Sequence, residues 1–395
     1  MIRLIKPLQQ LRRRTPIGWL QLSHDKGRML VAVAGIAFAD VLMFMQLGFQ
    51  NALYTSNTRL HETLQTDLVL IHPQARNLIN LSSFPRRRLY QAMNVPGVKS
   101  AEPVYVKIAN WKNPETRRET SLMVVGFNPN RPAFALPEVN QNLSAIKLPD
   151  TVLFDRASRG DYQETIAQIA GGKSVKAEVE RRTINVSGLF TVGASFAADG
   201  ILMTSDQNYL RLFPRQNAAS VNAGLIQLQP GADPVEVQQV LKAYLPPDVK
   251  VLTKQEFIDF EKNYWAKNTA IGFVFNLGVA MGFVVGVIIV YQILSTDVSD
   301  HIGEYATFKA MGYRHVYLLG IVFEEALILS FLGFLPGGVG VSFGLYSLTR
   351  KATNLPLYMT LIRAVAVLIL NVIMCTISGA IATRKLQAAD PADMF

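Results

Sequence analysis

The residue types that usually carry catalysis occur in this sequence, but their spacing forms no active site. Gly171-Gly-Lys-Ser174 imitates the end of a phosphate-binding loop, whose pattern needs glycine at the position held by Ala167. The five histidines show no metal-ligand spacing, and the lone cysteine, Cys375, lies in an apolar run. We therefore predict no catalytic, cofactor-binding or metal-binding residue and no ATP hydrolysis by this chain.

Two adjacent carboxylates, Glu324 and Glu325, lie within another apolar run. Carboxylates are costly inside a bilayer, and two neighbouring like charges favour protonation of one of them. Two readings follow, a proton relay or a structural role in membrane helix packing. We favour packing for Glu325.

A polar stretch over residues 295–315 separates two apolar runs. Ile302, Tyr305, Ala306 and Lys309 recur at the spacing of one helix face, and Gly312 stands where a helix would stop. A short helix of this kind between two membrane spans could be pushed by a partner. The alternative is a solvated loop.

The elements that must hold this stretch are membrane helices. With 395 residues, half of them hydrophobic, and a mean hydropathy of +0.21, the composition fits a few spans plus one sizeable water-exposed domain. Apolar runs of about 20 residues or more can cross a bilayer. We predict four spans, at 29–51, 269–294, 316–349 with a kink at 336–338, and 361–383.

Charge gives the orientation of the spans. Residues 1–28 carry seven Lys or Arg against one acid, which places this segment in the cytoplasm and makes nucleic-acid binding an unfavoured alternative. The stretch 295–315 and the tail 384–395 are then also cytoplasmic. Residues 350–360 form an outer loop.

Residues 52–268 contain no membrane-length apolar run. Short β-rich pieces alternate with helical ones, which predicts a large extracytoplasmic α+β domain, in one or two lobes, inserted between helices 1 and 2. No intrachain disulfide can form, so its core alone must hold it. In the second span, Gly278, Gly282 and Gly286 form a doubled G-x-x-x-G, which predicts close helix packing within a subunit or across a dimer.

The pattern Asp300-x-x-x-Glu304-Tyr305-x-x-x-Lys309-Ala-Met-Gly312 resembles the coupling helix of the MacB/FtsX/LolC class of ABC transporter permeases (type VII, mechanotransmission). The segment Phe323–Gly333 is similar to the E-A-x-x-L-S-x-x-G stretch of that class, which favours a structural or interfacial role for the two glutamates. The resemblance implies contact with a separate ATPase subunit. The residues it assigns to this contact are Asp300, Glu304, Tyr305, Phe308, Lys309 and Gly312.

Further stretches resemble the DevC branch of these permeases, namely 19–28, 33–40 and 188–200, and the ending Asp390-Pro-Ala-Asp393 resembles their common C-terminus. The resemblance implies a homodimer in the bacterial inner membrane, with ATP and Mg bound by the partner ATPase. It further implies a periplasmic adaptor, a TolC-like outer-membrane protein and a lipid-like substrate, with glycolipid suspected.

Three other function classes compete with export. An FtsX-like regulator would use the same movement to activate a cell-wall hydrolase without transport. A transmembrane sensor would need a cytoplasmic signalling domain, for which the cytoplasmic segments are too short. A proton-driven carrier is disfavoured, because four helices with few internal charges form a poor central pathway.

Overall fold

The computed structural model describes residues 17–384, which divide into two compact units. One unit, called the membrane unit here, comprises residues 17–50, 274–348 and 357–384. The other, called the ectodomain, comprises 51–273 and 349–356. The basic residues at 3–14, most of the predicted tail and the ending at 390–393 lie outside the described residues.

Four helices of the described chain are long and apolar enough to cross a membrane, as predicted. The third of these spans is continuous through three elements. The spans are α3 (Lys26–Thr63), α10 (Ala270–Asp300), α12 (His315–Gly333) with η2 (Phe334–Val341) and α13 (Ser342–Thr353), and α14 (Leu361–Ala382). Two short helices accompany them, α2 (Ile17–His24) and α11 (Ile302–Ala310).

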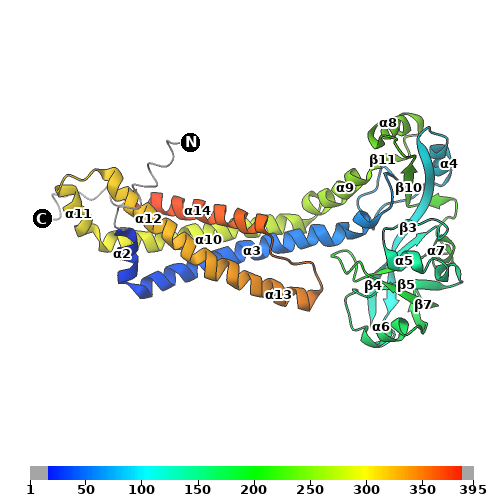
Figure 1. Ribbon diagram of the computed structural model, residues 1–395, viewed down its shortest axis with the longest axis horizontal. Coiled ribbons are helices and arrows are strands. Elements are labelled where there is room, and N and C mark those ends of the chain that lie inside the picture. The colour runs from blue at the N-terminus through cyan, green and yellow to red at the C-terminus, as the bar shows by residue number, and fades with distance from the viewer. Residues whose placement is uncertain (1–16, 385–395) are drawn as a thin grey trace. The chain divides into compact units, whose positions relative to one another are not determined.

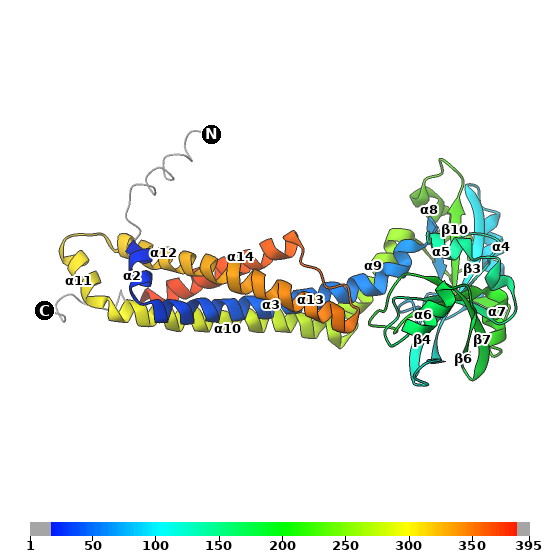
Figure 2. The ribbon, with the colours of Figure 1, turned by 60° about the horizontal axis from the view of Figure 1, so that its bottom comes forward.

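Within the membrane unit the long helices lie side by side (Figures 1 and 2). Their shared core is apolar and includes Ile36 of α3, Leu294 of α10, Leu329 of α12 and Met374 of α14. Large apolar side chains of α10, such as Phe273 and Met281, are exposed instead. This arrangement suits a bundle surrounded by hydrocarbon, because lipid tails satisfy apolar side chains.

The third span contains a π-helix at the position where the sequence predicts a kink. Pro336 lacks a backbone N–H and its ring would clash with the preceding turn of an α-helix. The wider π turn over Phe334–Val341 accommodates this residue together with Gly337 and Gly338. Helix α13 then continues to Thr353, so the predicted outer loop begins later than residue 350.

The ectodomain is built on a nine-stranded mixed sheet in the order β11-β1-β10-β3-β4-β8-β5-β7-β6. A separate two-stranded sheet pairs β2 with β9. The strands are β1 (Leu68–Ile71), β2 (Phe84–Pro85), β3 (Val98–Lys112), β4 (Glu119–Phe127), β5 (Thr151–Asp155), β6 (Val175–Val179), β7 (Arg182–Phe190), β8 (Ile201–Ser205), β9 (Ser220–Val221), β10 (Ala223–Leu228) and β11 (Lys250–Thr253).

Strand β3 joins two parts of this sheet. Its first half pairs with β10, with Val104 opposite Ala223, while its far end at Trp111 and Lys112 also pairs with β6. The strands β3-β4-β8-β5-β7-β6 therefore close on themselves. The predicted α+β domain is confirmed, and β3 is the strand that the two parts of its sheet share.

Both faces of the sheet are buried. In β1, Leu68 and Leu70 enter one core while Val69 and Ile71 enter the other, because successive side chains of a strand point to opposite faces. The first core also receives residues from α4, α6, α7 and α8, and the second from α5 and α9 (Figure 1). The helices are α4 (Arg87–Met93), α5 (Pro137–Gln141), α6 (Gln163–Ala170), α7 (Asp206–Leu212), α8 (Pro234–Tyr244) and α9 (Lys254–Lys267), with the short η1 (Ala145–Lys147).

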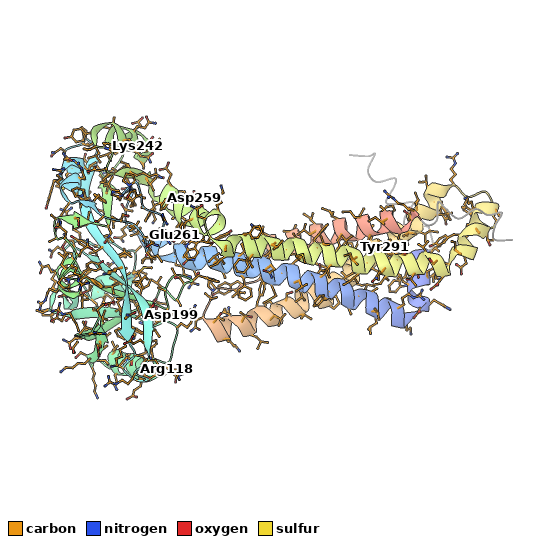
Figure 3. The ribbon with its side chains drawn as sticks, turned by 180° about the vertical axis from the view of Figure 1, so that it is seen from behind. Arg118, Asp199, Lys242, Asp259, Glu261 and Tyr291 are labelled. Carbon is orange, nitrogen blue, oxygen red and sulfur yellow. The ribbon has the colours of Figure 1, made fainter. Side chains whose placement is uncertain are left out.

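Helix α9 carries a buried carboxyl group, Glu261, which Figure 3 labels on this helix together with Asp259. The backbone N–H of Leu78 and the indole N–H of Trp265 donate to it, at 2.7 and 2.8 Å. The ring of His61 lies 3.6 Å from its Oε2. Burial disfavours the charged form and raises the pKa of Glu261 to about 7, although the two N–H donors act in the opposite direction.

Ectodomain stability should therefore fall as pH rises from about 4.5 to about 7, because the folded state holds a proton that the unfolded state has released. The loss is at most about 3 kcal/mol, since each unit of pKa difference is about 1.4 kcal/mol. Glu261→Gln should flatten this part of the stability profile, measured by thermal unfolding of the full chain. Asp259→Asn, which changes an exposed carboxyl on the same helix, should leave the slope intact. An unchanged slope in Glu261→Gln would contradict this account.

Candidate functional site: the coupling helix and its seat

Helix α11 is the polar helix predicted between the second and third spans. It runs from Ile302 to Ala310, and Gly312 follows with a φ of 87°, a left-handed conformation that ends a helix at little steric cost. The N–H groups of Gly312 and Tyr313 donate to the carbonyls of Lys309 and Phe308, both at 3.1 Å. A helix rather than a solvated loop is confirmed here.

The two faces of α11 have different surroundings. Tyr305 is buried in a small apolar cluster with Val298 of α10 and Leu318 and Val322 of α12, and the next residue, Ala306, is also buried. The face predicted to press on a partner is thus, at these two positions, packed against the chain's own helices. Its apolar period marks an inward face, which a sequence cannot distinguish from a docking face.

Glu304 and Lys309 lie on the exposed side of α11. Phe308 is partly buried and its ring meets that of Tyr313 edge to face, with ring centroids 5.6 Å apart. Gly312 is exposed, and an added methyl group would meet nothing within 4 Å. Of the six residues predicted for ATPase contact, Tyr305 is therefore the one that lies inward.

An ion-pair network joins the beginning of α3 to the end of α10, next to α11. One guanidinium nitrogen of Arg28 lies 2.7 Å from Asp300, and another lies 3.7 Å from Asp297 Oδ1. The side-chain amide of Gln21, from α2, reaches Glu304 at 3.5 Å. The pair of Arg28 with Asp300 is partly exposed, and such a pair contributes less than about 1 kcal/mol, so this contact orients the segment more than it stabilises the fold.

Beneath α11, the side chains of Tyr305, Asp297 and Glu325 come together. Burial and then the two neighbouring carboxyl groups raise the pKa of Tyr305, so its hydroxyl keeps its proton and remains a donor. Glu325 is completely buried, whereas the adjacent Glu324 is partly exposed. The two adjacent glutamates therefore have different surroundings, because successive helical residues point about 100° apart.

The three glycines of the second span lie against other helices of the same subunit. A Cβ on Gly278 would collide with the side chain of Gln46, and one on Gly282 would come within 3.2 Å of Met43 Cγ, both on α3. A Cβ on Gly286 would come within 2.9 Å of Ala39 Cβ and collide with a side chain of α14. In these contacts, the three glycines pack against helices of the same subunit.

Asp40 is another buried carboxyl group of the membrane unit. The side-chain amide of Asn371 donates to its Oδ2 at 2.6 Å and also lies 3.4 Å from the carbonyl oxygen of Ser330. A Cβ at Gly338 would come within 2.9 Å of Asp40 Cβ, so the π-helix approaches this site closely. This network joins α3, α12 and α14.

Sequence reasoning missed Arg28, Asp297 and Asn371 as members of these sites. Asn371 interrupts an apolar run, a signal that marks functional or partnered residues within membranes, whereas Asp297 lies in the polar stretch that follows the second span. Arg28 counted toward cytoplasmic charge alone, and no spacing rule connects it to a residue more than 270 positions away. Within residues 17–384, no group of three His, Cys, Asp or Glu side chains could hold a metal ion.

Residues 276–391 match the family model described as FtsX-like permease C-terminal. A search of curated proteins finds no match. Among solved structures, the periplasmic region of MacB from Actinobacillus actinomycetemcomitans is similar, with 9% identity over 51% of this chain and 94% of that one, and a TM-score of 0.32. The extracellular domain of the noncanonic ABC-type transporter YknZ from Gram-positive bacteria has 14% identity over 48% and 100%, with a TM-score of 0.30. Scores this low carry no further argument.

The C-terminal part of the chain, which includes α11, is thus an FtsX-like permease domain. For this C-terminal part of the chain, the match confirms the FtsX-like permease class that the coupling-helix pattern predicts. It is a multi-pass protein of the inner membrane with an extracytoplasmic domain. The class implies an ABC ATPase partner.

Gly286→Val should destabilise the membrane unit by about 1–3 kcal/mol, because the added atoms overfill the contact with α3 and α14. Thermal unfolding of the full chain in detergent measures the effect. Gly320→Val is the matched control, since a Cβ there meets nothing within 4 Å. Equal melting temperatures for the two variants would argue against close packing at Gly286.

Proposed function

We propose that this chain is the permease of an ATP-driven tripartite exporter, in which α11 receives movement from the ATPase. The observation that carries the proposal is the two-sided character of α11. Its inner face is fixed to α10 and α12 through Tyr305, while Glu304 and Lys309 remain exposed in an FtsX-like domain. A partner that binds the exposed face can displace the helix, and the buried face passes that displacement to the spans.

The proposed exporter contains two copies of this chain, an ATPase that binds ATP and Mg, a periplasmic adaptor and a TolC-like outer-membrane protein. Asp300, Phe308 and Gly312 complete the proposed ATPase contact with Glu304 and Lys309. Tyr305 supports this contact from the inner face of α11, where it packs against α10 and α12. The lipid-like substrate, with glycolipid as the specific proposal, rests on the resemblance to the DevC branch.

Glu304→Lys should uncouple ATP hydrolysis from transport while leaving the protein inserted. The change reverses a charge on the exposed face, and coupling between two sites is typically worth a factor on the order of ten. Transport of labelled lipid and ATP turnover, measured together in proteoliposomes, report the effect. Asp259→Lys makes the same charge reversal at an exposed position of α9 and should retain coupling. Unchanged transport in Glu304→Lys would contradict the assignment of α11 as the coupling helix.

Purification of the tagged chain in mild detergent, with mass spectrometry of the proteins that co-elute, should recover an ABC ATPase together with an adaptor. An ATPase with a cell-wall hydrolase and no adaptor would favour the FtsX-like regulator instead. Recovery of adaptor should persist in Glu304→Lys, while recovery of ATPase should fall. Absence of any ATPase from the wild-type eluate would contradict the proposal.

A further inference from the structure

The site beneath α11, called its seat here, contains two neighbouring carboxyl groups, and no described residue donates a hydrogen bond to the oxygens between them. Asp297 of α10 is 5% exposed and Glu325 of α12 is fully buried. Their side chains lie within hydrogen-bonding reach of each other. Both oxygens of Glu325 and Oδ2 of Asp297 nevertheless have no hydrogen-bond partner among the described residues.

A single proton shared by the two carboxyl groups would remove the repulsion between them and supply the missing donor. Two ionised carboxylates only accept hydrogen bonds, and they repel each other at close range. A single proton on either group turns the contact into an O–H···O⁻ hydrogen bond, which is among the stronger hydrogen bonds in proteins. The hydroxyl of Tyr305 is buried, has no hydrogen-bond partner among the described residues and lies near both carboxyl groups, so it can then donate to the carboxylate that remains.

The two oxygens of Asp297 face different groups. Oδ1 lies 3.7 Å from a guanidinium nitrogen of Arg28 and 3.6 Å from Nδ1 of His301. Oδ2 has no hydrogen-bond partner among the described residues. A nearby cation favours the ionised form of a carboxyl group, so Asp297 is the ionised member and Glu325 holds the proton.

We propose that Glu325 and Asp297 bind one proton between them, held on Glu325, and that this pair positions the coupling helix through Tyr305. The proton exchanges with water, so its release leaves both residues as carboxylates and adds no other reactant. Release would place two like charges beneath α11 and weaken its seat. The proton site itself stands on the geometry, whereas its effect on ATP coupling rests on the proposed function of α11.

A close neighbour marks the α2 side of this site. A Cβ on Gly18 would come within 2.9 Å of Glu325 Cγ, so α2 covers the carboxyl group from that side. The side-chain Oε1 of Gln21, also on α2, has no hydrogen-bond partner within residues 17–384. The other titratable or charged groups around the pair are Arg28, Asp300, His301, Glu304 and Glu324.

The test is hydrogen exchange of the α11 peptide, residues 302–310, in the full chain in lipid nanodiscs without ATPase. After correction for intrinsic exchange rates, protection of this peptide should fall in the wild type as pH rises. Glu325→Gln should abolish the pH dependence and keep protection, because its amide donates to Asp297 as the protonated acid does. Glu325→Ala should lose protection at every pH. Glu324→Gln should follow the wild type.

A wild-type profile independent of pH, or a Glu325→Gln variant as labile as Glu325→Ala, would overturn the proposal. If Glu325→Ala does not insert, the comparison of wild type with Glu325→Gln still decides. Exchange should be the same in Na⁺ and in N-methylglucamine at equal ionic strength. A dependence on Na⁺ would overturn proton binding in favour of a metal cation. Because no ATPase is present, failure of the Glu304→Lys test leaves this result untouched, and the reverse also holds.

Discussion

A polar group inside hydrocarbon must find its partner within the protein, and the membrane unit follows from this constraint. Asp40 and Asn371 meet at 2.6 Å between α3 and α14. The guanidinium of Arg363 donates to the carbonyl of Tyr358 at 2.8 Å and lies 3.3 Å from the hydroxyl of Tyr346. The apolar side chains of α10 take the outer positions that remain. Polar pairing thus sets which helix sides face each other.

Close approach of the helices depends on the same inward arrangement. The glycines of α10 and Gly338 of the π-helix remove side-chain volume where α3 passes. Because glycine has no side chain, the helices come close enough for Asp40 to contact Asn371 and for Gln46 to contact α10. Polar contact and backbone packing therefore support each other. A unit held in this way responds to displacement as a whole, because close-packed contacts have few intermediate arrangements. This property suits the proposed transfer of movement from α11 to the spans.

The sequence predicted the features that depend on local pattern. Four apolar runs, the break at Pro336 and the helix stop at Gly312 each follow from a rule that acts within about 20 residues. The sheet order did not follow, because β3 pairs with β10, β4 and β6 across distances that strand patterns do not encode. The seat of α11 was also missed, since Arg28, Asp297 and Glu325 meet through tertiary contact. The inward direction of Tyr305 has the same cause: a helical period identifies a face and leaves its partner open.

The buried carboxyl groups of Asp40 and Glu325 differ in one respect that separates their roles. Asp40 receives an N–H from Asn371, a donor that no change of pH removes. Glu325 receives none from the described residues and faces a second carboxyl group. A carboxylate with a fixed donor fastens the helices around it, whereas one that depends on a proton holds its neighbours conditionally. The fixed contact lies on α3 and α14 beside the π-helix, and the conditional one lies beneath α11. That division places the adjustable contact at the helix that a partner would move.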